Sequence, residues 1–125
     1  MGALLDAVVV GRTDRLFQVC TYSVSMARLL LRSTKSETFA TRIDVLFQNV
    51  KALKLPTSLD GLVVAKASPA DEARISAETG LLPSDETTLF TLRAGAFDGY
   101  VIAGVCVVAE DDGEYFEPSD LWREP

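Results

Sequence analysis

The stretch from Phe39 to Ala67 carries three successive strand patterns, and the rest of the chain is arranged around it. Along residues 39–47, apolar and polar positions alternate, and successive side chains of a strand point to opposite faces of a sheet. One face of this predicted strand consists of Phe39, Thr41, Ile43, Val45 and Phe47. The opposite face carries Arg42 and Asp44, and the presence of Leu46 on it predicts that this polar face is partly covered.

Further strand patterns lie within this stretch and on both sides of it. They cover residues 3–10, 16–22, 28–33, 50–55, 62–67, 87–93 and 100–109. The last of these is apolar on both faces, which is typical of a central strand that is covered twice. After it, Asp111-Asp112-Gly113 predicts a tight turn into a short return strand at residues 114–116, and therefore a hairpin.

One short helix is predicted at about residues 69–79. Ser68 can accept hydrogen bonds from the free backbone amides at its start, and Pro69 suits the first helical position. Asp71 completes a capping box, and Gly80 is a natural end. The apolar side chains of this segment are mostly alanines, which predicts a helix that lies close against a flat surface.

These elements predict an α+β protein that is mostly β, with a curved antiparallel sheet or open barrel and one short helix. Short connections between neighbouring strands favour hairpins and antiparallel pairing. A β-sandwich is the alternative arrangement. The length of 125 residues and the absence of repeats or linkers predict a single domain that spans residues 1–125.

The net charge of −6 is spread unevenly along the chain. Residues 1–54 carry eight Lys or Arg and four Asp or Glu, whereas residues 110–125 carry one and seven. The acidic total argues against nucleic acid as a partner, because phosphate neutralisation needs clustered basic side chains. An acidic C-terminal region instead suits a basic protein partner.

Two features of the sequence predict a cytoplasmic protein without a membrane partner. No apolar run approaches the roughly 20 residues of a transmembrane helix. The first six residues also lack the basic region with which an export signal begins. Cys20 and Cys106 each lie in an apolar strand pattern, so buried and reduced thiols are expected.

The chain contains no histidine, which restricts its catalytic chemistry. Ser-His-Asp and Cys-His catalysis and histidine-containing zinc sites are excluded, and two distant cysteines cannot form a Cys-only zinc site. Arg42 and Asp44, two positions apart on one strand, are interpreted as an exposed ion pair rather than as catalytic groups. The sequence therefore predicts no catalytic residue, no cofactor and no metal site, and it favours a protein without enzymatic activity.

The acidic run from Glu110 to Glu114 is the main candidate for a binding role. An EF-hand calcium loop would need an acidic residue where the chain has Val108 and a glutamate where it has Ser119. A solvated hairpin tip is the simplest interpretation, and a partner-binding acidic surface is the other. Nearby aromatic residues strengthen the second interpretation, because aromatic anchors are common at interfaces. The predicted binding residues are Asp111, Asp112, Glu114, Tyr115 and Trp122.

Residues 28–67 resemble small bacterial immunity-type proteins, which are compact β-rich members of toxin–immunity systems with many uncharacterised relatives. The resemblance lies in a strand pattern formed by Leu29-Leu30-Leu31-Arg32, the run from Ile43 to Val50, and Leu62-Val63-Val64. It implies a non-enzymatic protein that masks a toxin with an acidic surface. No functional residue is carried over from it.

Two hypotheses for the function come from different features of the chain. The first is a protein-binding module, immunity-like in type, that uses the acidic C-terminal surface to bind a protein partner. The alternative is a small-molecule-binding protein or a histidine-independent enzyme with a pocket between the sheet and the helix, since curved sheets often enclose apolar cavities. A homo-oligomer that pairs through an edge strand is a third interpretation.

Overall fold

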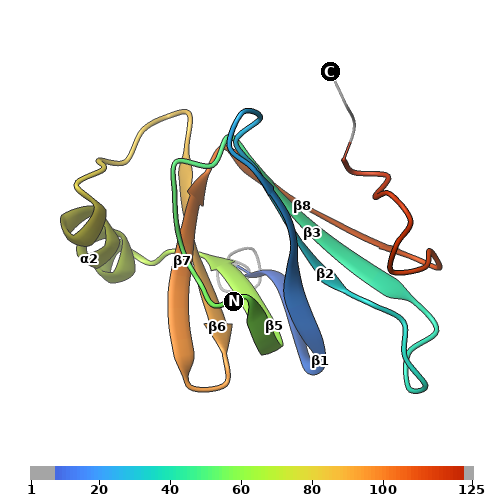
Figure 1. The fold of residues 1–125 in the computed structure, drawn as a ribbon. Helices are drawn as coiled ribbons and strands as arrows, with labels where there is room; N and C mark the ends of the chain where they lie inside the picture. The colour runs from blue at the N-terminus through green and yellow to red at the C-terminus, as the bar shows by residue number, and fades with distance from the viewer. Residues whose placement is uncertain (1–7, 123–125) are drawn as a thin grey trace.

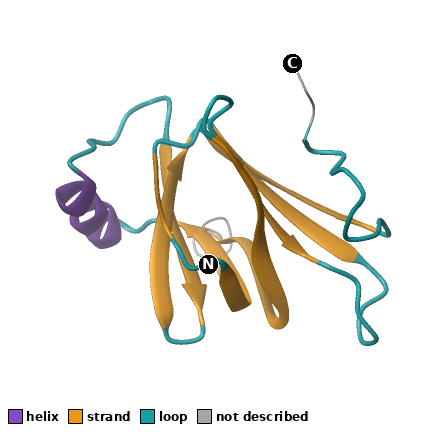
Figure 2. Ribbon diagram, in the orientation of Figure 1, coloured by secondary structure: helices purple, strands orange, loops and turns teal. Residues whose placement is uncertain are grey.

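The computed structural model describes residues 8–122 of the chain (Figure 1). Most of this part is β-strand, and it contains one helix (Figure 2). In chain order the elements are β1 (Val8–Ser23), β2 (Arg28–Ser33), β3 (Arg42–Gln48), β4 (Ala52–Lys54), β5 (Ser58–Lys66), α2 (Pro69–Thr79), β6 (Thr88–Ala94), β7 (Phe97–Ala103) and β8 (Val105–Asp111). The predicted fold class, α+β and mostly β, is confirmed.

The strands form one sheet with the order β4-β7-β6-β5-β1-β2-β3-β8. Every pair of neighbouring strands is antiparallel, as the short connections predict. Within the described residues the sheet is curved but is not closed into a barrel. Strands β4 and β8 therefore stand at its two ends.

The sheet bends so that β5, β6 and β7 face β1, β2 and β3 across a common core (Figure 1). Phe47 of β3 meets Phe90 of β6 in this core, with ring centroids 5.6 Å apart and an edge-to-face arrangement. On β3 the inward positions are Ile43, Val45 and Phe47, all buried in the core as the alternation of the sequence predicts. The outward positions of the same strand carry Arg42 and Asp44.

The apolar run at residues 100–109 is not one central strand, and the prediction for it is wrong. The chain bends at Gly104, whose N–H donates hydrogen bonds to the carbonyl oxygens of Gln48 (2.8 Å) and Asn49 (3.2 Å). Asn49 adopts a positive φ of 57°, so the facing chain bends at the same place. As a result β7 lies inside the sheet, whereas β8 is an edge strand with Val105 exposed.

Helix α2 begins and ends where the sequence predicts. The Ser68 side chain accepts a hydrogen bond from the Asp71 N–H at 3.2 Å, and Gly80 ends the helix with a φ of 76°. Its fully buried residue is Ile75, which fills the space between helix and sheet where the alternative hypothesis places a pocket. The side chains that Ile75 packs with are Leu89, Tyr100 and Ile102.

Several predicted strand boundaries differ from the structure. The pattern at residues 16–22 and the end of the pattern at 3–10 belong to the single strand β1, and residues 3–7 lie outside the described part. The strand predicted at 39–47 begins at Arg42, because residues 39–41 form part of a bent connection. The strand predicted at 50–55 shortens to β4.

The predicted hairpin after Asp111 is also wrong. Residues 114–116 form no strand in the structure, and the chain leaves the sheet after β8. It then runs across the outer face of the half that contains β2, β3 and β8 (Figure 1). We call residues 112–122 the C-terminal segment.

Candidate functional site

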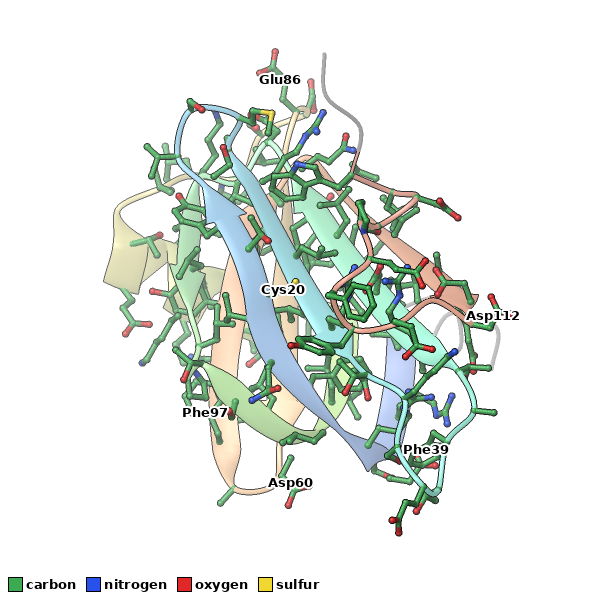
Figure 3. The ribbon with its side chains drawn as sticks, turned by 45° about the vertical axis from the view of Figure 1, so that its right-hand side comes forward. Cys20, Phe39, Asp60, Glu86, Phe97 and Asp112 are labelled. Atoms are coloured by element: carbon green, nitrogen blue, oxygen red, sulfur yellow. The ribbon has the colours of Figure 1, made fainter. Side chains whose placement is uncertain are left out.

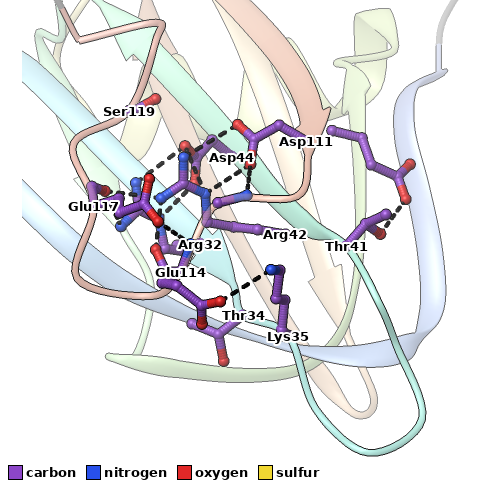
Figure 4. Close-up of polar contacts among 12 residues, drawn as sticks. Arg32, Thr34, Lys35, Thr41, Arg42, Asp44, Asp111, Glu114, Glu117 and Ser119 are labelled. Carbon is purple, nitrogen blue, oxygen red and sulfur yellow. Dashed lines mark hydrogen bonds and ion pairs between the residues drawn. The ribbon is translucent and has the colours of Figure 1, made fainter.

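Four charged side chains lie side by side on the outer face of β2, β3 and β8, and we call them the charge row (Figure 4). The strand register places Arg32 opposite Asp44 and Arg42 opposite Asp111. Nε and Nη2 of Arg32 donate to the two Asp44 oxygens at 2.7 and 3.1 Å. The same two nitrogens of Arg42 donate to Asp111 at 2.9 and 3.1 Å. Positive and negative groups thus alternate across three strands.

The two arginines of the charge row also hold the C-terminal segment. Nη1 of Arg32 and Nη1 of Arg42 each donate to two backbone carbonyl oxygens of the segment, at distances from 2.7 to 3.2 Å (Figure 4). A guanidinium carries five donors in one plane, so it can bind a carboxylate on one edge and carbonyls on another. The accepting carbonyls belong to Glu114, Tyr115 and Glu117.

The C-terminal segment buries Arg32, Arg42 and Asp44 of the charge row and partly covers Asp111, which corrects the prediction of an exposed ion pair on β3. Arg42 is 3% exposed and Asp44 is 1% exposed. Leu30 and Leu46, on the same outer face, are buried as well, so this is the cover that Leu46 indicates in the sequence. Removal of one partner of a buried pair costs about 3–5 kcal/mol, because the other charge stays buried without compensation.

The contact between Arg42 and Asp111 shifts the pKa of both groups. The hydrogen bond from Arg42 lowers the pKa of Asp111 below its ordinary value, although partial burial of the carboxylate works against this shift. The Gly113 N–H, at 2.9 Å from the carboxylate, lowers the pKa of Asp111 further. The same ion pair raises the pKa of Arg42. Asp111 is therefore ionised at neutral pH and fixes the start of the C-terminal segment.

A groove of about 520 Å³ lies between the C-terminal segment and the outer face of β1 and β2, and we call it the surface groove. Its floor contains Leu30 and Arg32 of β2 together with residues 18–21 of β1, on which Figure 3 labels Cys20. Its wall consists of residues 115–119 and Trp122. The volume lies within the range of about 300–1,000 Å³ that is usual for ligand sites.

Three aromatic side chains border the surface groove. Tyr115 is 68% exposed and Phe116 is 74% exposed. Their rings stand almost perpendicular, at 87°, with centroids 5.7 Å apart. The third ring, Trp122, carries the guanidinium of Arg28 at 5.6 Å from its centroid. Large exposed aromatic rings beside a groove are typical of recognition surfaces.

The five predicted binding residues lie close together in sequence but have different environments. Asp111 belongs to the charge row and holds the C-terminal segment in place. Asp112 and Glu114 are exposed on that segment. Tyr115 and Trp122 line the surface groove. Four of the five residues are thus available to a partner, whereas Asp111 supports the others.

The sequence patterns predict Arg42 and Asp44 only as an exposed ion pair and predict no site role for Arg32. A signal for them does exist, because Leu30 and Leu46 share their outer face and apolar residues on a polar face indicate a cover. The surface groove itself has no such signal. It forms because Arg32 reaches a carbonyl oxygen 83 positions further along the chain.

The two cysteines differ, and the prediction of a buried thiol is wrong for one of them. Both are free, but Cys20 is exposed and lines the surface groove. Phe17 and Val19 face the core, so the alternation along β1 places Cys20 on the outer face, although the run around it is apolar. Cys106 is half-buried, and burial raises the pKa of its thiol to about 12.

Neither a metal cluster nor a membrane-spanning helix is found in the described part of the chain. Among residues 8–122, no group of three or more His, Cys, Asp or Glu side chains could hold a metal ion. The helix in the same residues is too short to cross a membrane.

Comparison of the chain with models of protein families, with curated proteins and with solved structures gave no match. The resemblance to immunity-type proteins therefore stays a prediction. The fold and the site together define only a class of protein. It is a mostly β domain in which two buried arginines hold the C-terminal segment, and this segment forms a groove on the outer face of the sheet.

Proposed function

We propose that this protein is a non-enzymatic binding module that contacts a basic protein partner through its C-terminal segment. The observation that supports the proposal is the hold of Arg32 and Arg42 on the backbone of the segment. Because the backbone is bound from beneath, the side chains of Asp112, Glu114 and Tyr115 are left exposed. A surface that is already ordered loses little conformational entropy on binding. An immunity role, which the resemblance implies, is one form of this function.

The charge of the C-terminal segment also supports a basic partner. Residues 112–122 contain four acidic residues and no Lys or Arg. One of these acids, Glu114, is paired with Lys35 at 3.1 Å in an exposed contact that a partner can replace at low cost. Such a surface raises the rate of association with a basic protein, and salt screens the effect.

The proposal is tested by capture of a partner with paired variants. The tagged protein is incubated with lysate of its source cells, cross-linked, and analysed by mass spectrometry. Asp112→Ser with Glu114→Ser removes two charges from the C-terminal segment and leaves Asp111 in place, because Asp111 holds the segment. The matched control, Asp85→Ser with Glu86→Ser, removes two exposed charges from the connection before β6 (Figure 3).

The two variants should behave differently. Loss of two charge contacts of up to about 1 kcal/mol each corresponds to binding that is weaker by up to roughly thirtyfold, so recovery of the partner should fall for the segment variant only. Added salt should lower recovery by the wild type as well. Equal recovery by the wild type and both variants, with unchanged urea unfolding curves, would rule out the acidic segment as the binding surface.

A further inference from the structure

We propose that the surface groove binds the guanidinium group of an arginine side chain from an extended basic segment of the partner. This inference rests on the proposed function and names the chemistry that the site selects. The feature that carries it is a groove with exposed aromatic faces, an apolar floor and unused hydrogen-bond acceptors, whose wall is formed by the acidic C-terminal segment.

The aromatic residues offer a stacking site for a planar cation. The rings of Tyr115 and Phe116 are perpendicular and largely exposed, so their faces are accessible from the groove and its rim. A guanidinium group stacks on such faces and keeps its in-plane donors free for hydrogen bonds. The contact of Arg28 with Trp122 is an example of the same interaction in this region of the protein.

The groove also presents acceptors that the protein itself does not use. Gln18 and Thr34 line it, and no described residue donates a hydrogen bond to the side-chain carbonyl of Gln18 or to the hydroxyl of Thr34. Glu117 stands on the wall, and one of its carboxylate oxygens accepts the Glu114 N–H at 3.1 Å. Its second oxygen has no donor among the described residues. These acceptors suit a ligand that brings several N–H donors.

The floor of the groove suits the stem of an arginine side chain. Leu30 provides apolar surface there, along which three methylene groups can pack while the charged end reaches the aromatic wall. Arg32 also reaches the floor, but its charge is compensated by Asp44 at 2.7 Å, and its Nη1 is bound to carbonyl oxygens of the segment. It therefore does not prepare the groove for an anion.

The balance of charge around the groove favours a cation over a neutral ligand or an anion. The basic side chains around the groove are the two arginines of the charge row, Lys35 and Arg28, which makes four. The carboxylates are the two of the charge row and four on the C-terminal segment, which makes six. The excess of negative charge is on the exposed side, where the partner approaches. The carboxylates on the segment are Asp112, Glu114, Glu117 and Asp120.

The test uses a peptide probe and its neutral isostere. The probe is the blocked hexapeptide acetyl-Gly-Arg-Gly-Arg-Gly-Gly-amide, and the control has citrulline in place of both arginines. Binding to the full chain is followed by amide chemical shifts and by the fluorescence of Trp122, the single tryptophan of the chain. The rate at which iodoacetamide modifies Cys20, an exposed residue of the groove lining, gives an independent measure of occupancy.

The arginine peptide should bind at least about fivefold more tightly than the citrulline peptide, because both the cation–π contact and the charge favour arginine. Bound peptide should shift the amides of residues 115–119 and slow the modification of Cys20. Tyr115→Ala with Phe116→Ala should weaken binding by about tenfold. The control is Leu82→Ala, which removes an exposed apolar side chain (82%) outside the groove and should not change binding.

Equal binding of the two peptides, no binding of either, or shifts confined to residues outside the groove would overturn the inference. The outcome is separable from that of the proposed function. If the arginine peptide fails while Asp112→Ser with Glu114→Ser still abolishes partner capture, the inference is wrong and the function stands. If the peptide binds in the groove while that variant captures the partner normally, the acidic segment is not the partner surface and the chemistry of the groove stands.

Discussion

Arg42 and Asp111 face each other across β3 and β8 and are joined by two hydrogen bonds, of 2.9 and 3.1 Å. The same guanidinium group donates to the carbonyl oxygens of Glu114 and Glu117, both at 2.8 Å. One side chain thus connects the edge of the sheet to the C-terminal segment. The surface that we propose for partner binding depends on this connection.

Asp111→Asn should lower the free energy of unfolding by about 1.5–3 kcal/mol, the usual value of a hydrogen bond to a charged group. The reason is that Arg42 stays buried and loses its charged acceptor. Urea unfolding measures the change. Asp112→Asn is the matched control and should change stability by less than about 0.5 kcal/mol, because the Asp112 side chain is exposed. Similar losses for the two variants would mean that the ion pair contributes nothing specific.

The contribution of Asp111 to stability should depend on pH in the acid range. Its pKa in the folded protein lies below the ordinary value of 3.8, so the unfolded chain takes up the proton first as the pH falls. The stabilisation is therefore fully present above a pH of about 4 to 5 and is lost as the pH falls through the pKa of the folded state. Urea unfolding between neutral pH and about pH 3 should show a steeper loss for the wild type than for Asp111→Asn. Parallel curves for the two proteins would contradict this account.

The inner face of the fold could be predicted from the sequence because its signals are local. The alternation along β3 correctly places Val45 and Phe47 in the core. Ser68 and Gly80 correctly mark the ends of α2, since a capping side chain and a residue with positive φ act within one turn of the helix.

On the outer face, Leu46 predicts a cover, but the segment that forms this cover could not be predicted, because distant contacts override the local signals there. Asp111-Asp112-Gly113 has the composition of a hairpin turn, yet the Asp111 side chain binds Arg42, which is 69 positions away. Arg32 then holds the chain that follows. These contacts draw the C-terminal segment across the sheet and form the surface groove, which no spacing in the sequence could indicate.

Gly113→Ala should displace the C-terminal segment. A Cβ atom at this position would lie 2.5 Å from Nη2 of Arg42, closer than such contacts allow, and that guanidinium is held on both sides. We expect a shift in Trp122 fluorescence and faster hydrogen exchange of the segment amides. Gly11→Ala is the control, since among residues 8–122 its new Cβ would meet only Val8, at an ordinary 3.8 Å. If Gly113→Ala leaves both signals unchanged, the close contact with Arg42 does not position the segment.

Cys20 and Cys106 should react with iodoacetamide at very different rates, since the thiolate is the reactive form. Cys20 is exposed, whereas Cys106 is half-buried with its pKa raised to about 12. At pH 8 only about one in ten thousand of the Cys106 thiols is then ionised. Mass spectrometry of the folded protein should find Cys20 modified first and Cys106 modified only after unfolding in urea. Cys20→Ser should remove the fast reaction completely. Rapid modification of Cys106 in the folded protein would instead mean that β8 opens away from β3. The charge row joins these two strands, so it could not then hold the C-terminal segment in place.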